Sequence, residues 1–330
     1  MKAVQVVRFG APDVLQIAEI ARPEPGAGEV LVRLDFAGVN FIDVYMRSGH
    51  YARSHTYQTP LPMTIGMEGA GVVAALGSGV TEFRIGQRVA YCIVRGSYAE
   101  FAVVPAAKLV AIPDGVPTSI AAALMLQGLT AHYLTHSAYA LGAGKSCLVH
   151  AGAGGVGQLL IQLAKARGAR VIATVGSEEK AAIAAARGAD ATVLYRSTDF
   201  RAAVREWTDG AGVDVVYDSV GRDTIHGSLG CLKRRGTCVL YGASSGQVEA
   251  VAPLELAEAG SVFFTRPHLA DYLQPHEVRV RAAELFALVA ERRLEVSIER
   301  HYALAEAAEA HRHLEGRGTR GKLLLAVADA

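Results

Sequence analysis

A glycine-rich segment at residues 146–158 constrains the fold of this chain more than any other stretch. The apolar run 147–151 predicts a buried strand, and residues 156–167 carry leucines at helical spacing. The turn between them holds three glycines in the spacing G-x-G-x-x-G: Gly152, Gly154 and Gly157. Between a strand and a helix this spacing predicts a dinucleotide site, because glycines allow a tight turn, approach of a pyrophosphate and close helix packing.

The sequence after Ser119 alternates between helix and strand patterns. A helix is expected from Ser119 to Leu134, as a bridge between two domains. Strand patterns follow at 147–151, 170–175, 191–195, 214–218, 237–241 and 261–264, with helix patterns at 156–167, 178–187, 200–209 and 224–233. This alternation predicts an α/β fold with a doubly wound parallel sheet and helices on both faces.

The two ends of the chain have a different pattern. Short strand patterns at 30–36, 68–76, 88–91 and 96–104, separated by glycines, predict a compact barrel-like domain. Near the C-terminus, helices are expected at 275–292 and 304–314 and a strand at 322–327, which can return to pack on the first domain. We therefore divide the chain into residues 1–122, 123–266 and 267–330.

Composition narrows the class of protein. Length (330 residues) favours two domains, 51% of residues are hydrophobic, and no apolar run approaches the ~20 residues of a membrane span. The first residues look like a strand, and the four cysteines form no C-x-x-C pair, so we expect a cytoplasmic protein with reduced thiols. A net charge of +1 without a basic block argues against nucleic acid as a partner.

The second strand of the α/β region indicates which dinucleotide binds. NAD-specific proteins place an acidic residue at the end of this strand, for the ribose hydroxyls. Here the strand ends at Gly176 and Ser177, and Lys180 follows. A small residue, a hydroxyl and a cation suit a 2′-phosphate, and Tyr195 and Arg196 could add a ring and a charge. We therefore favour NADPH over NADH.

Five motifs together resemble one family. Residues 38–49, 127–130, 152–157, 217–223 and 264–267, in this order, are similar to the zinc-independent, zeta-crystallin-like quinone oxidoreductases of the medium-chain dehydrogenase/reductase superfamily. The resemblance covers essentially the whole chain. It implies a GroES-like β-barrel, a Rossmann domain, a C-terminal return to the barrel, NADPH as cofactor, a quinone substrate and a homodimer.

The resemblance also implies which residues contact the cofactor. It places Asn40, Phe41 and Tyr45 in a cleft loop on the nicotinamide side. The other implied contacts are Thr130; Gly155 and Val156 with the three motif glycines; Gly176, Ser177 and Lys180, with Tyr195 beside them; Ser219; Tyr241, Gly242, Ala243 and Ser244; Phe264, Thr265 and Arg266; and Arg317. Tyr45 is the one candidate catalytic side chain, since a phenol could hydrogen-bond a substrate carbonyl; packing on the cofactor is the alternative.

Zinc ligands are missing from the expected places. The resemblance puts Asn40 and Met67 where the zinc alcohol dehydrogenases have cysteine and histidine. An amide or thioether cannot hold zinc comparably, so we expect no metal. Glu68, which follows Met67, is expected to support a loop by hydrogen bonds.

Four histidines are weaker candidates for metal ligands or active-site groups. His132 and His136 have a spacing that can hold a metal, but no third ligand accompanies them. His311 and His313 are expected to be solvated on the surface of a helix. None of the four is assigned a function.

Quinone reduction suits a chain without zinc, because the acceptor is already electrophilic. Two alternatives stay open. The first is reduction of the activated C=C bond of an enal or enone, which uses the same hydride geometry. The second is a non-catalytic role, either crystallin-like or RNA-binding, although RNA binding needs clustered cations. The stretch 50–60 borders the expected cleft and leaves the substrate preference open.

Overall fold

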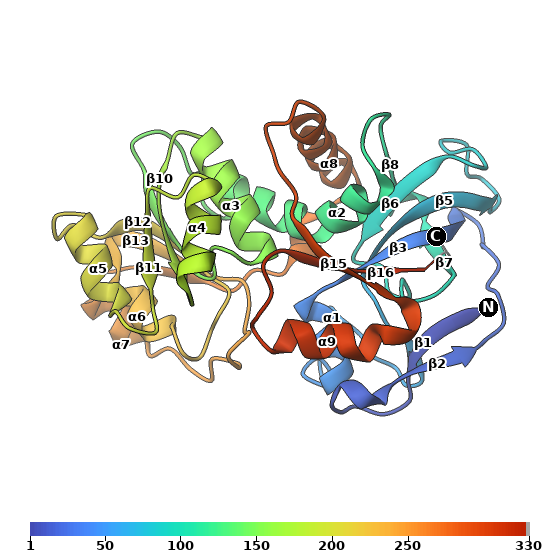
Figure 1. Cartoon of the computed structure of the whole chain (residues 1–330), viewed down its shortest axis with the longest axis horizontal. Helices are drawn as coiled ribbons and strands as arrows, with labels where there is room; N and C mark the ends of the chain where they lie inside the picture. The colour runs from blue at the N-terminus through green and yellow to red at the C-terminus, as the bar shows by residue number, and fades with distance from the viewer. Residues whose placement is uncertain (328–330) are drawn as a thin grey trace. The chain divides into compact units, whose positions relative to one another are not determined.

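The computed structural model describes residues 1–327, which form two compact units (Figure 1). The first unit contains residues 1–129 together with the described part of the chain from Leu273 onward, and the second contains Thr130–Tyr272. Helix α2 (Thr118–Tyr133) contains the point at which the chain passes from one unit to the other. No helix in the described range is long and apolar enough to cross a membrane.

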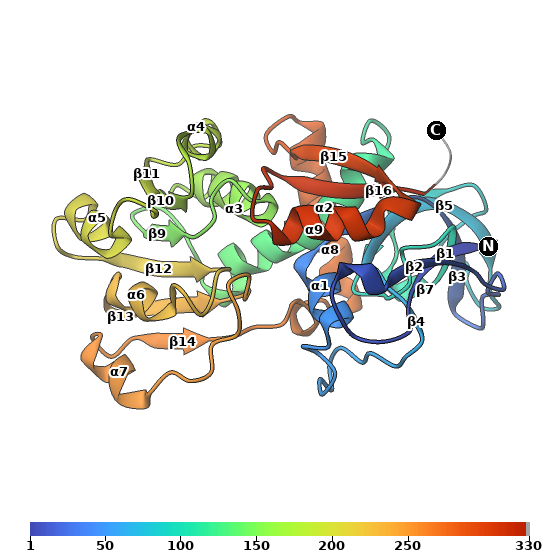
Figure 2. The same cartoon turned by 60° about the horizontal axis from the view of Figure 1, so that its bottom comes forward.

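A six-stranded parallel sheet forms the centre of the second unit, in the order β11–β10–β9–β12–β13–β14 (Figure 2). Its strands are β9 (Ser146–Val149), β10 (Arg170–Val175), β11 (Ala191–Leu194), β12 (Val213–Asp218), β13 (Leu232–Leu240) and β14 (Phe263–Thr265). The strand order reverses between β9 and β12. This arrangement confirms the predicted doubly wound sheet.

Helices cover both faces of this sheet. In Figure 1, α3 (Gly155–Ala166) and α4 (Glu178–Ala186) lie on one face, and α5 (Phe200–Trp207) and α6 (Ile225–Gly230) lie on the other. Helix α7 (Pro253–Glu258) precedes β14. The core between them is aliphatic and includes Leu148, Ile172 and Val216.

Strand β13 is the main departure from the predicted boundaries of this unit. It begins at Leu232 rather than at residue 237, so the helix expected at 224–233 ends at Gly230. Leu232 pairs with Val213 and Thr237 pairs with Val215, which leaves residues 233–236 as a bulge. Arg235 adopts a left-handed conformation there (φ 59°). The bulge interrupts the alternation of buried and exposed residues along the strand, so the sequence pattern did not predict that the strand begins at Leu232.

The first unit contains two sheets. The larger has the order β15–β16–β3–β5–β6–β8, with β7 also paired to β3, and the smaller has the order β2–β1–β4. The larger sheet consists of β3 (Glu29–Val39), β5 (Glu68–Leu76), β6 (Arg88–Cys92), β7 (Phe101–Pro105), β8 (Val110–Ala111), β15 (Ile298–Ala303) and β16 (Lys322–Ala326); the smaller of β1 (Lys2–Val6), β2 (Leu15–Glu19) and β4 (Met63–Thr64). Helices α8 (Pro275–Ala290) and α9 (Ala307–Glu315) belong to the same unit.

Strand β16 joins distant parts of the sequence. It runs antiparallel to β3, with Leu323 opposite Val39 and Leu324 opposite Gly38. This pairing brings Lys322, at the start of β16, to the end of β3. The following residues, Phe41–Ser48, form helix α1 rather than the loop that the resemblance implied.

The ends of α1 are specified locally. The Asp43 carboxylate accepts a hydrogen bond from the Asn40 N–H at 2.9 Å, which satisfies a donor at the start of the helix. Gly49 ends the helix in the left-handed conformation (φ 85°). The expectation of a loop was wrong because it ignored this cap.

The glycine turn after β9 packs tightly. A Cβ at Gly152 would lie 2.7 Å from the Ala173 Cβ on β10, and a Cβ at Gly157 would overlap the Ala151 carbonyl oxygen. The residue of the turn that adopts a positive φ is Ala151 (54°) rather than a glycine. The glycines are therefore needed for close approach of helix and strand.

We expect Gly157→Ala to destabilise the protein by about 1–3 kcal/mol, because the added methyl group must displace backbone atoms. The matched control is Gly142→Ala, since a Cβ there meets no atom within 4 Å. Urea denaturation followed by circular dichroism measures both. Equal midpoints for the two variants would contradict the packing role of Gly157.

Candidate functional site

The predicted nucleotide-binding residues of the second unit gather at one edge of its sheet. They follow or end the six parallel strands: Gly152–Gly157 after β9, Gly176–Lys180 after β10, Tyr195 after β11, Ser219 after β12, Tyr241–Ser244 after β13, and Phe264–Arg266 at the end of β14. Carboxyl ends of parallel strands are where doubly wound sheets bind ligands. Thr130 is buried in the last turn of α2.

The turn after β9 fits a diphosphate. Helix α3 begins at Gly155 with Gly154 as its N-cap, and no side chain caps its first turn. The first backbone N–H groups of a helix have no intrahelical acceptor, so they are suited to phosphate oxygens. The Gln158 side chain holds the turn by donating to the Ala153 carbonyl at 2.8 Å.

The turn after β10 brings together a hydroxyl, a ring and a guanidinium. Ser177 caps α4 by accepting from the Lys180 N–H at 3.3 Å. A Cβ at Gly176 would lie 3.1 Å from the Tyr195 hydroxyl and 3.5 Å from Arg196 Nε. Glycine at 176 therefore leaves space beside two donors that suit a 2′-phosphate.

The Asp218 carboxylate organises the loop after β12. It accepts from the N–H groups of Val220 and Gly221 at 2.8 and 3.0 Å, and from the hydroxyls of Thr224 and Ser228 at 2.8 and 2.7 Å. The Ser244 N–H donates to the Ser219 carbonyl at 3.1 Å, and a Cβ at Gly242 would lie 2.6 Å from that oxygen. The structure thus brings Ser219 and residues 241–244 into contact.

Four predicted residues belong to the first unit. Asn40 precedes α1, and Phe41 and Tyr45 lie one turn apart on it with ring centroids separated by 6.0 Å. The Tyr45 ring also meets Tyr51 edge to face at 5.6 Å. Arg317 lies in the turn between α9 and β16 with φ 57°. A catalytic role for Tyr45 stays a prediction.

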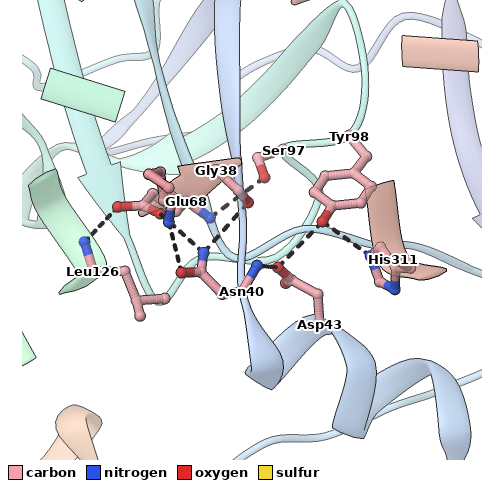
Figure 3. A network of polar contacts seen from close by, with 9 residues as sticks. Gly38, Asn40, Asp43, Glu68, Ser97, Tyr98, Leu126 and His311 are labelled. Carbon is pink, nitrogen blue, oxygen red and sulfur yellow. Dashed lines mark hydrogen bonds and ion pairs between the residues drawn. The ribbon is translucent and has the colours of Figure 1, made fainter. Parts of the chain in front are cut away.

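A buried polar network begins at Asn40 (Figure 3). Lys322 Nζ donates to Asn40 Oδ1 at 2.6 Å and to Glu68 Oε2 at 2.5 Å. Asn40 Nδ2 donates to the same Glu68 oxygen at 2.9 Å, and the other Glu68 oxygen accepts from the Leu126 N–H at 2.5 Å. The Lys322 and Glu68 side chains are 0% exposed. The sequence pattern did not identify Lys322 as a site residue. The one indication was the position of this lysine at the start of an otherwise apolar strand.

A second arm of hydrogen bonds runs from Asp43 through Tyr98 to His311 (Figure 3). The Tyr98 hydroxyl lies 3.3 Å from Asp43 Oδ2 and 3.1 Å from His311 Nε2. Burial raises the pKa of Asp43 to about 7 and lowers the pKa of His311 to about 3. The expectation that His311 is solvated was wrong, because its face of α9 packs inward.

The donor set near Asn40 does not fit zinc. Glu68 is bound by an ammonium, and Cys92, its partner across β5 and β6, has its pKa raised well above the usual value by burial, which disfavours the thiolate that zinc prefers. Within residues 1–327, no group of three or more His, Cys, Asp or Glu side chains is arranged to hold a metal. His132 and His136 stack on each other at 3.9 Å.

Comparison with known proteins identifies matching family models, related sequences and a similar solved structure. Residues 26–114 match the alcohol dehydrogenase GroES-like domain, and residues 155–278 match the zinc-binding dehydrogenase family. A quinone oxidoreductase of Pseudomonas aeruginosa is 44% identical over 98% of this chain and 99% of its own length. A 2-haloacrylate reductase of Burkholderia sp is 40% identical over 98% of both chains. The solved structure of Escherichia coli quinone oxidoreductase complexed with NADPH superimposes with a TM-score of 0.95, at 39% identity, over 99% of this chain and 100% of that one.

The raised pKa of Asp43 predicts a pH-dependent stability. Between about pH 4, the unfolded value, and pH 7 the folded protein holds a proton that the unfolded chain releases, so this residue lowers stability as the pH rises. Asp43→Asn removes the effect. Within this window, the free energy of unfolding of the variant relative to that of the wild type should rise by up to about 1.4 kcal/mol per pH unit. Urea denaturation at roughly pH 5 and pH 7 measures this change. If the difference in unfolding free energy between variant and wild type does not change with pH, Asp43 is ionised in the folded protein.

Proposed function

The chain belongs to the quinone oxidoreductase family of the zinc-binding dehydrogenases, and from this premise we propose that it reduces quinones with NADPH and without zinc. The observation that carries the proposal is the turn after β10, where Ser177, Tyr195 and Arg196 surround a glycine and no acidic side chain stands at the strand end. Such a turn favours a 2′-phosphate over free ribose hydroxyls.

The residues of the chain bind and orient the cofactor. When bound, NADPH supplies a hydride from the nicotinamide ring. The first N–H groups of α3 bind the diphosphate, and Ser177, Lys180 and Arg196 bind the 2′-phosphate. The further proposed contacts are Tyr195 with the adenine; Ser219 with the adenosine; Tyr241–Ser244 with the nicotinamide ribose; Phe264–Arg266 with the carboxamide; and Asn40, Phe41, Tyr45, Thr130 and Arg317.

The acceptor makes few chemical demands on the protein. The conjugated quinone is electrophilic without a Lewis acid, so alignment with the nicotinamide and exclusion of competing reactions are the main contributions of the chain. We place the Tyr45 phenol as a hydrogen-bond donor to a quinone oxygen. Water supplies the remaining proton.

Reduction of an activated C=C bond is the second candidate. It is favoured by the similarity to a 2-haloacrylate reductase, which has the same level of identity as several quinone oxidoreductases. Both reactions accept a hydride on a conjugated system, so the site described here is compatible with either. A panel of benzoquinones, enones and acrylates under identical conditions separates them by kcat/KM.

We also propose that the protein is a cytoplasmic homodimer. All four cysteines are unpaired and buried, as expected of reduced thiols. Strand β14 is the edge of its sheet, and Phe263 on it is 63% exposed. An uncovered strand edge with an apolar side chain favours pairing with a second copy.

Phe263→Glu should shift the protein from dimer to monomer, because a carboxylate would be buried at the paired edge. Sedimentation equilibrium measures the mass of each species. Ile85→Glu is the control, since Ile85 is 69% exposed and belongs to the first unit. A wild-type monomer, or equal dissociation of both variants, would refute β14 as the interface.

The cofactor assignment is tested by quinone-dependent oxidation of NADPH and NADH after chelator treatment. The wild type should prefer NADPH. The Lys180→Ala/Arg196→Ala variant should lose about 10- to 100-fold in kcat/KM for NADPH with little change for NADH, because charged hydrogen bonds to a phosphate are lost. Arg201→Ala/Arg293→Ala, which removes two exposed arginines that pair with Asp199 and Glu291, is the charge-matched control. Wild-type rates no better with NADPH than with NADH would refute the assignment.

A further inference from the structure

Lys322 forms an ion pair at a fully buried position, and the proposed function does not use it. We propose that Lys322 is a positioning residue whose ammonium group fixes the Glu68 carboxylate and the Asn40 amide and, through them, helices α1 and α2. The inference rests on the proposed function for the reaction that it affects.

The hydrogen bonds allow only one orientation of the Asn40 amide. Its oxygen accepts from Lys322 at 2.6 Å, and its NH₂ group donates to Glu68 at 2.9 Å and to the Gly38 carbonyl at 3.3 Å. A rotated amide would direct its donors at an ammonium and its acceptor at a carboxylate. Lys322 and Glu68 therefore set the position of the residue that precedes α1.

The same pair reaches two segments that carry proposed cofactor contacts. Helix α1 begins directly after Asn40 and presents Phe41 and Tyr45. The second oxygen of Glu68 accepts from the Leu126 N–H at 2.5 Å, within α2 and four positions before Thr130. One buried ion pair thus connects β16, the start of α1 and the middle of α2.

The surrounding residues make space for this pair. A Cβ at Gly38 would overlap Glu68 Oε2 and lie 3.0 Å from Lys322 Cε. Glycine at 38 is therefore required by the ion pair rather than by the backbone conformation. Because the carboxylate is already neutralised by the ammonium, a divalent cation would meet a fixed positive charge at Asn40.

A purely structural ion pair would give the same burial, so the test must separate positioning from stability. Lys322→Met alone would leave Glu68 as an unpaired buried carboxylate. The test therefore uses the charge-balanced Lys322→Met/Glu68→Gln variant, in which the side-chain oxygen at position 68 can still accept a hydrogen bond from the Leu126 N–H. The matched control is Lys233→Met/Asp214→Asn, which removes a 2.9 Å ion pair from the second unit.

The positioning role predicts a specific kinetic pattern. In the charge-balanced variant kcat for quinone reduction should fall by about 10-fold or more, while the Kd for NADP⁺, measured by calorimetry, changes by less than about 3-fold. Asn40→Ala should lower kcat in the wild type and have little further effect in this variant, because both changes remove the same constraint. The control should retain wild-type kcat.

Hydrogen exchange gives a readout that needs no activity. Amides of residues 40–48 and of Leu126 should exchange faster in the charge-balanced variant than in the wild type or the control. Wild-type kcat in this variant, unchanged exchange in α1, or multiplicative effects of Asn40→Ala would each overturn the inference. A wild type inactive with every acceptor overturns the proposed function instead, and exchange then decides whether Lys322 fixes α1.

Discussion

The burial of a lysine ammonium against a glutamate carboxylate is the interaction on which the first unit's candidate residues depend. Neither charge is stable alone in an apolar interior, and together they also satisfy an asparagine amide and a helical N–H group. This arrangement explains why glycine stands at position 38 and why the donor set is unsuited to zinc although the chain belongs to a family named for that metal.

The second unit depends on a different constraint, the geometry of a parallel sheet. Six carboxyl ends meet at one edge, so residues spread from Gly152 to Arg266 in the sequence come together without any direct attraction between them. Asp218 then fixes the loop after β12 by accepting hydrogen bonds from four donor groups, and Gly242 allows the next loop to contact it. In this unit the backbone geometry of the sheet brings the candidate residues together, whereas in the first unit we infer that the ion pair positions them.

Local patterns in the sequence were sufficient for regular strands and helices in both units and insufficient for features that depend on a bulge, a helix cap or a distant partner. Strand β10 and the start of α4 follow from apolar runs and a serine cap, and strand β5 was predicted over its full length, 68–76. The bulge before Thr237 and the helix at Phe41–Ser48 were not predicted, because each depends on one unpaired stretch or one cap. The strand of Lys322 and the helix of His311 were predicted, but the burial of these side chains was not, since their partners, Asn40 and Tyr98, lie more than two hundred residues away in the chain.

The pairing of β16 with β3 has a consequence for biosynthesis. During translation, the N-terminal sheet emerges first but lacks its neighbouring strand and its internal cation until residue 322 has left the ribosome, after the entire second unit. Until that moment Glu68 has no ammonium partner, so its carboxylate must stay in contact with water in the nascent first unit. Among the described residues, β16 is thus synthesised after every other strand and completes the larger sheet of the first unit, so a chain truncated before it could have a complete Rossmann sheet while its GroES-like part is incomplete.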